Sequence, residues 1–106
     1  MSAVKEAFYE KYAQTAIDQQ IKYGIPASIT LQQMALESGY GTSDLAANYN
    51  NYFGVKAGSS WKGPTIMKVD DHNYPEAFRV YGSVEESVEN HSKVLMASRY
   101  RNCFKY

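Results

Sequence analysis

The sequence predicts a small α+β domain that is mainly helical and carries one β-hairpin. Three segments repeat apolar residues at the spacing of amphipathic helices, and a fourth holds two runs of strand-forming residues around a turn. The chain has 106 residues, of which 44% are hydrophobic and 21% charged, a composition typical of a globular protein. We therefore expect one domain over residues 1–106.

The first predicted helix spans residues 3–23. Its apolar residues recur at helical spacing, and Gly24 follows as a C-terminal stop. These apolar residues are Val4, Phe8, Tyr12, Ala16, Ile17 and Ile21. We expect this helix to support the rest of the fold.

The second predicted helix opens at Pro26, because proline is tolerated in the first turn of a helix. Gly39 and Gly41 end it. One face is apolar or small and consists of Leu31, Met34, Ala35 and Ser38. On another face, a polar line runs along the helix through Thr30, Gln33 and Glu37. We expect this polar line to face a cleft.

A long structured loop follows, "TSDLAANYNNYFGVKAGSSWKGP", with at most a short helix over residues 43–47. Residues 65–69 then favour a strand, "DDHNYP" has the composition of a turn, and residues 77–81 favour a second strand. This pattern predicts a β-hairpin.

The last predicted helix begins with a capping box, in which Ser83 and Glu86 stand three residues apart. Val84, Val88 and Leu95 form its apolar face. His91 falls on the same face, and the simpler interpretation is a hydrogen-bonded histidine of the core or groove. A catalytic histidine is the alternative.

Charge and cysteine content exclude several classes of function. Eleven basic residues balance eleven acidic ones, so no basic surface for nucleic acid is expected. Cys103 is the single cysteine, and neither a disulfide nor a zinc site is supported. No apolar run approaches the length of a membrane span, and the start of the chain lacks the apolar core of a signal peptide.

Glu37 is the most informative residue of the chain because of its place at the end of a helix. The carboxyl end of a helix carries partial negative charge, which favours the protonated form of a carboxyl group there. A protonated glutamic acid beside a cleft can act as a general acid. The alternative is an ordinary solvated glutamate.

Several ordered motifs resemble the bacterial glucosaminidase family of peptidoglycan hydrolases, glycoside hydrolase family seventy-three, which includes flagellar rod-assembly hydrolases and autolysins. They are "GIPASITLQQMALESGYGTSDLA", "NYNNYFGVKA", a Trp-Lys-Gly segment and "FRVYGSVEESVENHSKVL", which together cover residues 24–100. The resemblance implies a lysozyme-like fold, with helices around a cleft and a small β-hairpin lobe.

The resemblance also implies catalytic roles. Glu37 matches the family's catalytic acid. The family's second acidic residue lies on the hairpin, where Asp70 and Asp71 are the candidates and a turn-forming aspartate pair is the alternative. A hairpin carboxylate could serve an inverting or a retaining reaction, and the sugar's own acetamido group could replace it.

Other residues gain roles through the same resemblance. Candidates for substrate binding are Gln33, Tyr40, Lys56, Trp61 and Tyr81. Asn50 and Asn51 are expected to brace their loop by bonding its backbone, with Phe53 packed beneath. Asn90 stands where the family often has an aspartate.

The function implied is hydrolysis of peptidoglycan glycan strands at N-acetylglucosamine, as an endo-β-N-acetylglucosaminidase that needs no metal or cofactor. A lytic transglycosylase or muramidase on the same scaffold is one alternative, and a non-catalytic glycan-binding or assembly module is another. The implied location is the cell wall, the periplasm or the secreted fraction, and a phage-encoded lysin also fits.

Members of the family usually continue past the position of Tyr106 into a segment that closes the cleft. We therefore expect apolar residues between positions 94 and 106 to be partly uncovered and to contact a second copy of the chain or a partner segment. These residues are Val94, Leu95, Tyr100, Phe104 and Tyr106.

Overall fold

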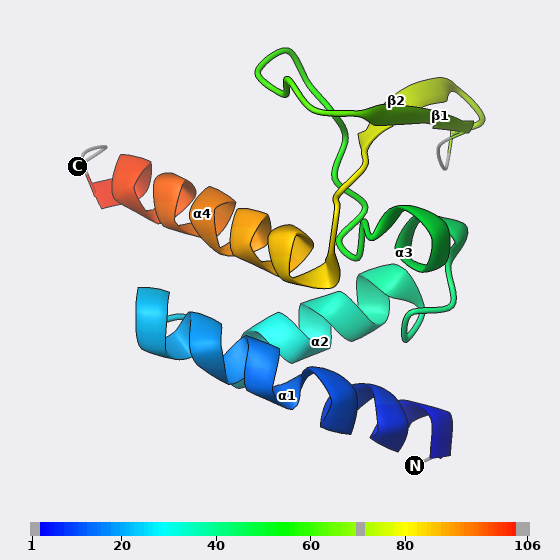
Figure 1. Ribbon diagram of the computed structural model, residues 1–106. Coiled ribbons are helices and arrows are strands. Elements are labelled where there is room, and N and C mark those ends of the chain that lie inside the picture. The colour runs from blue at the N-terminus through cyan, green and yellow to red at the C-terminus, as the bar shows by residue number, and fades with distance from the viewer. Residues whose placement is uncertain (1–2, 70–71, 104–106) are drawn as a thin grey trace.

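The computed structural model describes residues 3–69 and 72–103, with side chains through residue 98. The elements are α1 (Ala3–Tyr23), α2 (Ala27–Ser38), α3 (Asp44–Tyr49), β1 (Thr65–Val69), β2 (Pro75–Arg79) and α4 (Val84–Cys103). The helices form a body and the hairpin lies to one side of it (Figure 1), so the α+β, mainly helical class is confirmed. None of the described helices is both long and apolar enough to cross a membrane.

Helix α1 has the predicted bounds, but its buried face is narrower than predicted. Phe8, Tyr12 and Ala16 are buried, whereas Val4 is 60% exposed and Ile21 is 79% exposed. A step of four residues turns a helix by about 40° more than one full turn, so a row of such steps spirals around the helix. The middle of this row faces the core, and its two ends turn into solvent.

Helix α2 begins after Pro26, which is its N-cap, and buries Met34, Ala35 and Ser38 as predicted. The predicted polar line is wrong at Thr30, which is fully buried. Thr30 lies four residues before Met34 and therefore belongs to the buried face. Gln33 and Glu37 remain exposed on the neighbouring row.

Helix α2 ends in a tight turn that uses left-handed backbone conformations. Gly39, Tyr40 and Gly41 have φ values of 57°, 57° and 82°. The Tyr40 amide donates to the Ala35 carbonyl over 2.8 Å, and the Ser38 hydroxyl accepts from the Gly41 amide over 2.9 Å. The turn therefore fixes the last helical residues, Glu37 among them.

Helix α3 is longer than the predicted segment 43–47. Ser43 is its N-cap, and the Ser43 hydroxyl accepts from the Ala46 amide over 3.2 Å. Asn50 closes the helix in a left-handed conformation with a φ of 57°. Ala46 is buried and brings this short helix into the core.

The hairpin is confirmed, with β1 at the predicted bounds and β2 displaced. The strands pair antiparallel from Thr65 opposite Arg79 to Val69 opposite Pro75. We expected the second strand over residues 77–81, and it begins at Pro75, because proline can occupy the first residue of a strand. Val80 and Tyr81 instead bond the backbone of Pro64 and Tyr49.

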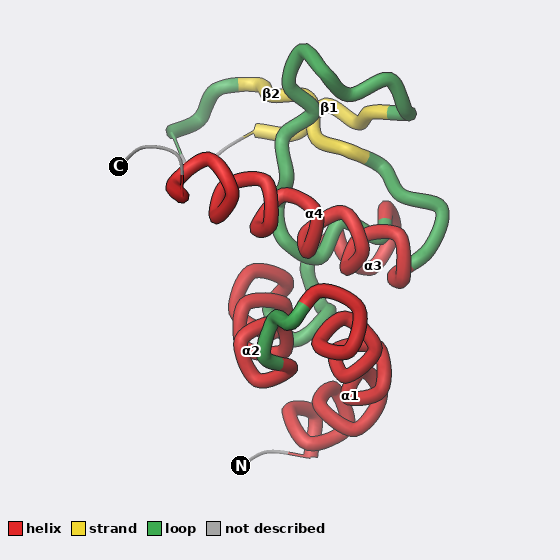
Figure 2. The backbone as a smooth tube through the Cα atoms, turned by 90° about the vertical axis from the view of Figure 1, so that its left-hand side faces the viewer, coloured by secondary structure: helices red, strands yellow, loops and turns green. Residues whose placement is uncertain are grey.

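Helix α4 begins with a variant of the predicted capping box. The Ser83 hydroxyl accepts from the Glu86 amide over 3.2 Å, and the Glu86 carboxylate accepts from the Gly82 amide over 3.0 Å rather than from the amide of Ser83. Figure 2 shows α4 lying across the pair formed by α1 and α2. The core where these elements meet contains Phe8, Tyr12, Met34, Ala35, Ala46, Tyr52 and Val88.

Some predicted residues lie outside the described part of the chain. They are Asp70, Asp71, Phe104 and Tyr106, together with the side chain of Tyr100.

Candidate active site

Glu37 borders a groove between the helical body and the hairpin. The groove has a volume of about 450 Å³. Its helical wall is formed by Glu37, Ser43, Asp44 and Leu45, its hairpin wall by Lys68, Val69, His72 and Phe78, and its floor between them by Gly54 and Lys56. Glu37 is exposed in the last turn of α2, so its carboxyl group is open to a ligand in this groove.

Asn51 holds the loop that forms the floor of the groove. Its side-chain amide donates to the carbonyls of Val55 and Arg79 over 3.0 and 2.9 Å, and its side-chain oxygen accepts from the Val55 amide over 3.0 Å. Asn50 donates to the Tyr81 carbonyl over 3.0 Å. The prediction that the asparagines brace the backbone of their loop is confirmed for Asn51, whereas Asn50 joins the loop to the backbone of Tyr81.

Gly54 brings this loop close to the candidate acid. Its φ of 63° lies in the left-handed region, which glycine adopts without strain. A Cβ atom at this position would lie 3.8 Å from Oε2 of Glu37, the nearest atom among the described residues other than its chain neighbours. The braced loop therefore sets the space on one side of the Glu37 carboxyl group.

The two walls of the groove carry opposite charges. Lys68 on β1 forms an ion pair with Asp44, the first residue of α3. The Lys68 ammonium lowers the pKa of Asp44, with a further contribution from Asn48, and Asp44 in turn raises the pKa of Lys68. Lys56 lies 3.8 Å from Glu76 of β2.

The structure brings one of the five predicted substrate-binding residues to the groove, namely Lys56. Gln33 is exposed one turn before Glu37 but does not line the groove. Tyr40 packs edge-on against Phe8 and Tyr9 of α1, with ring centroids 5.8 and 6.0 Å apart. The left-handed turn after Glu37 directs Tyr40 towards α1 and away from the groove.

Trp61 and Tyr81 lie together in a separate hollow of about 220 Å³ beside α4. Their rings are 5.4 Å apart, and the Arg79 guanidinium lies 4.8 Å from the Trp61 ring centroid. Tyr81 is only 4% exposed, and its hydroxyl donates to Asn90 over 2.6 Å. Arg79 also donates to Asn90 and to the Lys56 carbonyl, each over 3.1 Å, and so links this hollow to the floor of the groove.

His91 stacks on Phe53, with ring centroids 3.8 Å apart and an interplanar angle of 7°. Phe53 therefore packs beneath its loop as predicted. Burial lowers the pKa of His91 to about 4, and Nδ1 has no hydrogen-bond partner among the described residues. His91 does not line the groove, so its position supports a packing role, although the expected hydrogen bond is not seen at Nδ1.

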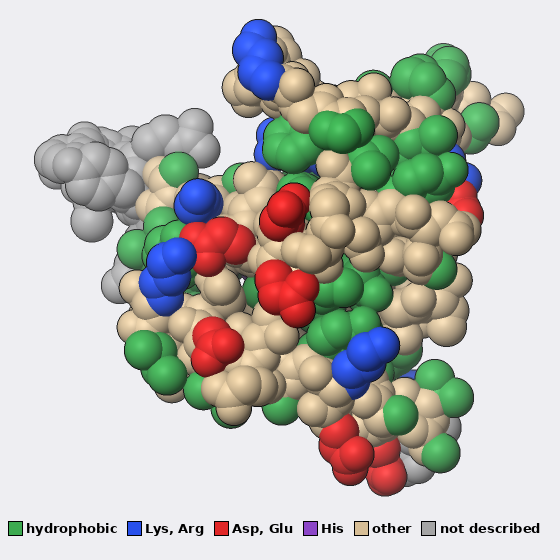
Figure 3. Space-filling view, viewed as in Figure 1, with side chains coloured by type: hydrophobic (Ala, Val, Ile, Leu, Met, Phe, Trp, Pro, Cys, Tyr) green, Lys and Arg blue, Asp and Glu red, His purple; other side chains and the backbone are tan. Residues whose placement is uncertain are grey.

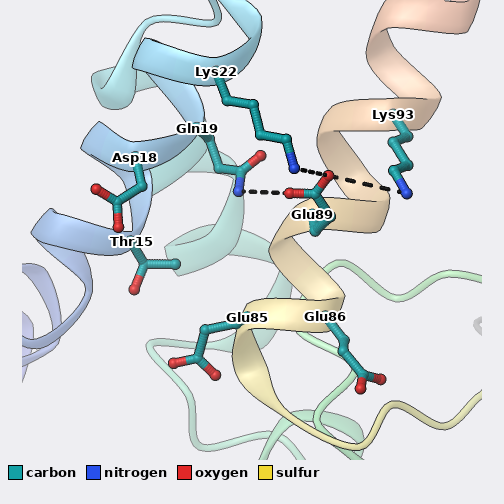
Figure 4. Close-up of a pocket in the computed structure, with 8 residues that line it drawn as sticks. All are labelled: Thr15, Asp18, Gln19, Lys22, Glu85, Glu86, Glu89 and Lys93. Atoms are coloured by element: carbon teal, nitrogen blue, oxygen red, sulfur yellow. Dashed lines mark hydrogen bonds and ion pairs between the residues drawn. The ribbon is translucent and has the colours of Figure 1, made fainter.

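A further hollow, of about 600 Å³, lies between α1 and α4 and contains none of the predicted site residues. Figure 4 shows Glu89 at its centre, where the carboxylate accepts from Gln19 over 3.2 Å and from Lys22 over 3.0 Å. The Tyr23 hydroxyl also donates to Glu89, and Lys93 lies 4.0 Å away. Acidic and basic side chains mix on this face of the molecule (Figure 3). The bonds of Gln19 and Lys22 to Glu89 join α1 to α4.

We expect Glu89→Gln to lower the free energy of unfolding by about 1–2 kcal/mol at neutral pH. Hydrogen bonds from Tyr23, Lys22 and Gln19 lower the pKa of Glu89 from 4.5 to about 2. A lowered folded-state pKa stabilises the protein above the normal pKa of glutamate, and this contribution is lost as the pH falls from 4.5 towards 2. Thermal unfolding of both proteins across this range should show a difference that shrinks on acidification. A difference independent of pH would contradict the assignment.

Sequence reasoning missed most of the groove, including Asp44 and Lys68. One sequence signal could have identified Lys68. In a strand over residues 65–69, Lys68 shares a face with Ile66, and this face is the half-buried one in the structure. A lysine on the half-buried face of a strand favours a polar partner.

Within the described residues, no cluster of His, Cys, Asp and Glu is arranged to hold a metal ion.

The sequence matches the glucosaminidase family over residues 13–106, a family described as mannosyl-glycoprotein endo-beta-N-acetylglucosaminidase. It is 36% identical over 92 residues to the exo-glucosaminidase LytG of Bacillus subtilis, and the matched region covers 80% of this chain and 32% of LytG. It is 37% identical over 83 residues to the peptidoglycan hydrolase FlgJ of Salmonella typhimurium, covering 68% of this chain and 26% of FlgJ. The chain thus spans about a third or less of these relatives.

The fold is similar to that of solved hydrolase domains. The glycoside hydrolase domain of Salmonella typhimurium FlgJ superimposes with a TM-score of 0.73 at 31% identity, covering 90% of this chain and 61% of that domain. The lysozyme-like architecture implied by the sequence motifs is therefore confirmed. The chain therefore belongs to the glucosaminidase family, glycoside hydrolase family seventy-three.

Proposed function

We propose that this chain hydrolyses peptidoglycan glycan strands at N-acetylglucosamine, with Glu37 as the general acid. The observation that carries the proposal is the position of Glu37, exposed at the end of α2 and bordering the groove between the two lobes. Relatives named as a glucosaminidase and as a peptidoglycan hydrolase support the substrate class. Neutral net charge and a groove with mixed charge suit a glycan better than a polyanion.

In the proposed reaction, the Glu37 carboxyl group donates its proton to the glycosidic oxygen as the bond from that oxygen to the anomeric carbon breaks. An oxocarbenium-like centre develops at the anomeric carbon, and water then adds to it. The hydroxyl group of the water becomes part of the new reducing end, and its other proton passes to a carboxylate of the site. Asp70 and Asp71 remain the proposed hairpin carboxylates. A separation of about 6.5–9.5 Å from Glu37 would suit an inverting reaction, and about 5 Å a retaining one. Without either carboxylate, the acetamido group of the substrate would act as the nucleophile.

Residues around the groove have proposed roles in binding. We propose that Lys56 contacts a glycan directly, and its position in the lining of the same groove as Glu37 supports this role. Trp61 and Tyr81 could reach only a longer strand that extends past the groove to the α4 hollow. Gln33 and Tyr40 remain proposed substrate-binding residues, although neither lines the groove.

An exo-acting enzyme is the second candidate, because LytG is named an exo-glucosaminidase. Digestion of purified peptidoglycan and mass spectrometry of the products distinguish the two modes. Long fragments that end in reducing N-acetylglucosamine support an endo-acting glucosaminidase, and short fragments with the same end support an exo-acting one. Reducing N-acetylmuramic acid, or its anhydro form, would support a muramidase or a lytic transglycosylase. The absence of any product would support a binding module.

We also propose that the chain acts at the cell wall, outside the cytoplasmic membrane, because peptidoglycan lies there.

Contact between two copies through residues 94–106 is a further proposal, supported by Val94, which is 49% exposed. Leu95 is half-buried. We expect sedimentation velocity of the 106-residue chain to show a dimer at high protein concentration. A strictly monomeric chain would contradict this proposal.

A further inference from the structure

The ion pair between Lys68 and Asp44 joins the two lobes across the groove that contains Glu37. Lys68 lies on β1, and Asp44 is the first residue of α3, 24 residues earlier in the chain. Both residues line the groove. In Figure 1 the hairpin lies above α3, so the pair connects the hairpin wall with the helical wall.

The other strand of the hairpin is attached differently. The backbone of residues 55–57 runs beside β2, where the Ala57 amide donates to the Ala77 carbonyl over 2.8 Å and the Arg79 amide donates to the Val55 carbonyl over 3.1 Å. Strand β1 pairs with the opposite edge of β2 and is therefore the outer strand. Backbone bonds hold the inner strand to the body, whereas the Lys68 side chain ties the outer strand to it.

The exposure of the ion pair suits a contact that forms and breaks. The Asp44 side chain is 46% exposed and the Lys68 side chain 34% exposed. Ion pairs this exposed contribute little to folding stability, because water competes for both charges and salt screens them. The fold therefore does not depend on this pair, and the pair can open while the rest of the structure persists.

We propose that Lys68 is a positioning residue: its ion pair with Asp44 opens to admit a glycan strand and forms again to hold the outer strand of the hairpin over the bound glycan. The role of the glycan in this inference rests on the proposed function. In the closed state, Lys68 keeps Val69 of the outer strand on the hairpin side of the groove and so sets the width of the groove. Loss of the pair leaves Glu37 and the inner strand β2 in place and frees the outer strand β1 to move away from α3.

Kinetic variants test the effect on the reaction. We expect Lys68→Gln to lower kcat by about two- to fivefold, the range that an exposed ion pair can supply, with little change in KM. Lys68→Arg should restore kcat because it keeps the charge.

Asp44→Asn keeps an acceptor for Asn48 and should lower kcat as much as Lys68→Gln does. The double variant should have a kcat no lower than that of either single variant. Lys62→Gln removes a positive charge outside the groove and should leave kcat unchanged. Additive losses in the double variant would contradict the coupling.

A distance measurement tests the closure itself and needs no glycan. Spin labels are attached at Ala47→Cys on α3 and Met67→Cys on the exposed face of β1, in a Cys103→Ser background that removes the single native cysteine. Circular dichroism checks that each labelled protein is folded. We expect one narrow distance distribution with Lys68 or Lys68→Arg. We expect a broader and longer one with Lys68→Gln, or with Lys68 in about 1 M salt.

Identical distributions for the Lys68 and Lys68→Gln proteins would overturn the proposal, whatever the chain does to peptidoglycan. Conversely, a chain without glycan cleavage that still shows the opening would overturn the proposed function and leave the ionic contact in place.

Discussion

Glu37→Gln is expected to reduce glycan cleavage by about 100- to 10,000-fold, the range that a general acid contributes. The amide has nearly the shape of the carboxyl group but cannot donate a proton of comparable acidity to the leaving oxygen. Glu37 is exposed and has no hydrogen bond to the described residues, so the substitution should leave the fold and glycan binding nearly unchanged. Release of soluble fragments from purified peptidoglycan measures the rate.

The matched control for this prediction is Glu10→Gln, which makes the same chemical change at an exposed position of α1. It should retain the activity of the unmodified chain. If Glu37→Gln kept more than about a hundredth of that activity, Glu37 could not be the general acid.

Asn51→Ala is expected to cause the largest loss of stability, about 3 kcal/mol or more. Asn51 is only 1% exposed, and its side chain makes three hydrogen bonds to the backbone of Val55 and Arg79. Alanine leaves the Val55 amide and the Arg79 carbonyl without these partners, while the Val55 carbonyl keeps its bond from the Arg79 amide. Each unsatisfied group costs about 1–3 kcal/mol. The same change should also lower the glycan-cleaving activity at temperatures at which the variant is still folded, because the loop no longer holds Gly54 beside Glu37.

Chemical denaturation measures the free energy of unfolding of this variant beside Asn48→Ala. Asn48 is exposed and makes one side-chain bond, to Asp44, so its loss should cost no more than about 0.5 kcal/mol. Equal stability of the two variants would show that the Asn51 hydrogen bonds do not hold the loop.

Local sequence signals predicted the elements well where one signal dominated. Helix α1 and strand β1 have the predicted bounds, because helical spacing ending in a glycine and a run of β-branched residues are both local properties. Thr30 shows where this reasoning fails. Because Thr30 is polar, the sequence predicted that it faces the cleft. Its position four residues before Met34 places it on the buried face instead. The packing of the helix therefore outweighs the free-energy cost of burying one hydroxyl group.

The site could be predicted only in part from the sequence. Glu37 and Lys56 lie in the groove, and both were found through motifs that are contiguous in the chain. Tyr40 follows Glu37 by three residues, yet a left-handed turn between them directs its ring to α1. The pairing of Asp44 with Lys68 depends on how the hairpin lies over α3, which no local pattern in the sequence determines.

Digestion of peptidoglycan in water enriched in oxygen-18 tests the central claim most directly. Hydrolysis adds a hydroxyl group from the solvent to the anomeric carbon, whereas a lytic transglycosylase closes an internal anhydro ring and takes no oxygen from water. We predict fragments with one oxygen-18 atom at a reducing N-acetylglucosamine from the unmodified chain, and almost none from Glu37→Gln. Unlabelled anhydro products, label on N-acetylmuramic acid, or equal labelled product from both proteins would contradict the account.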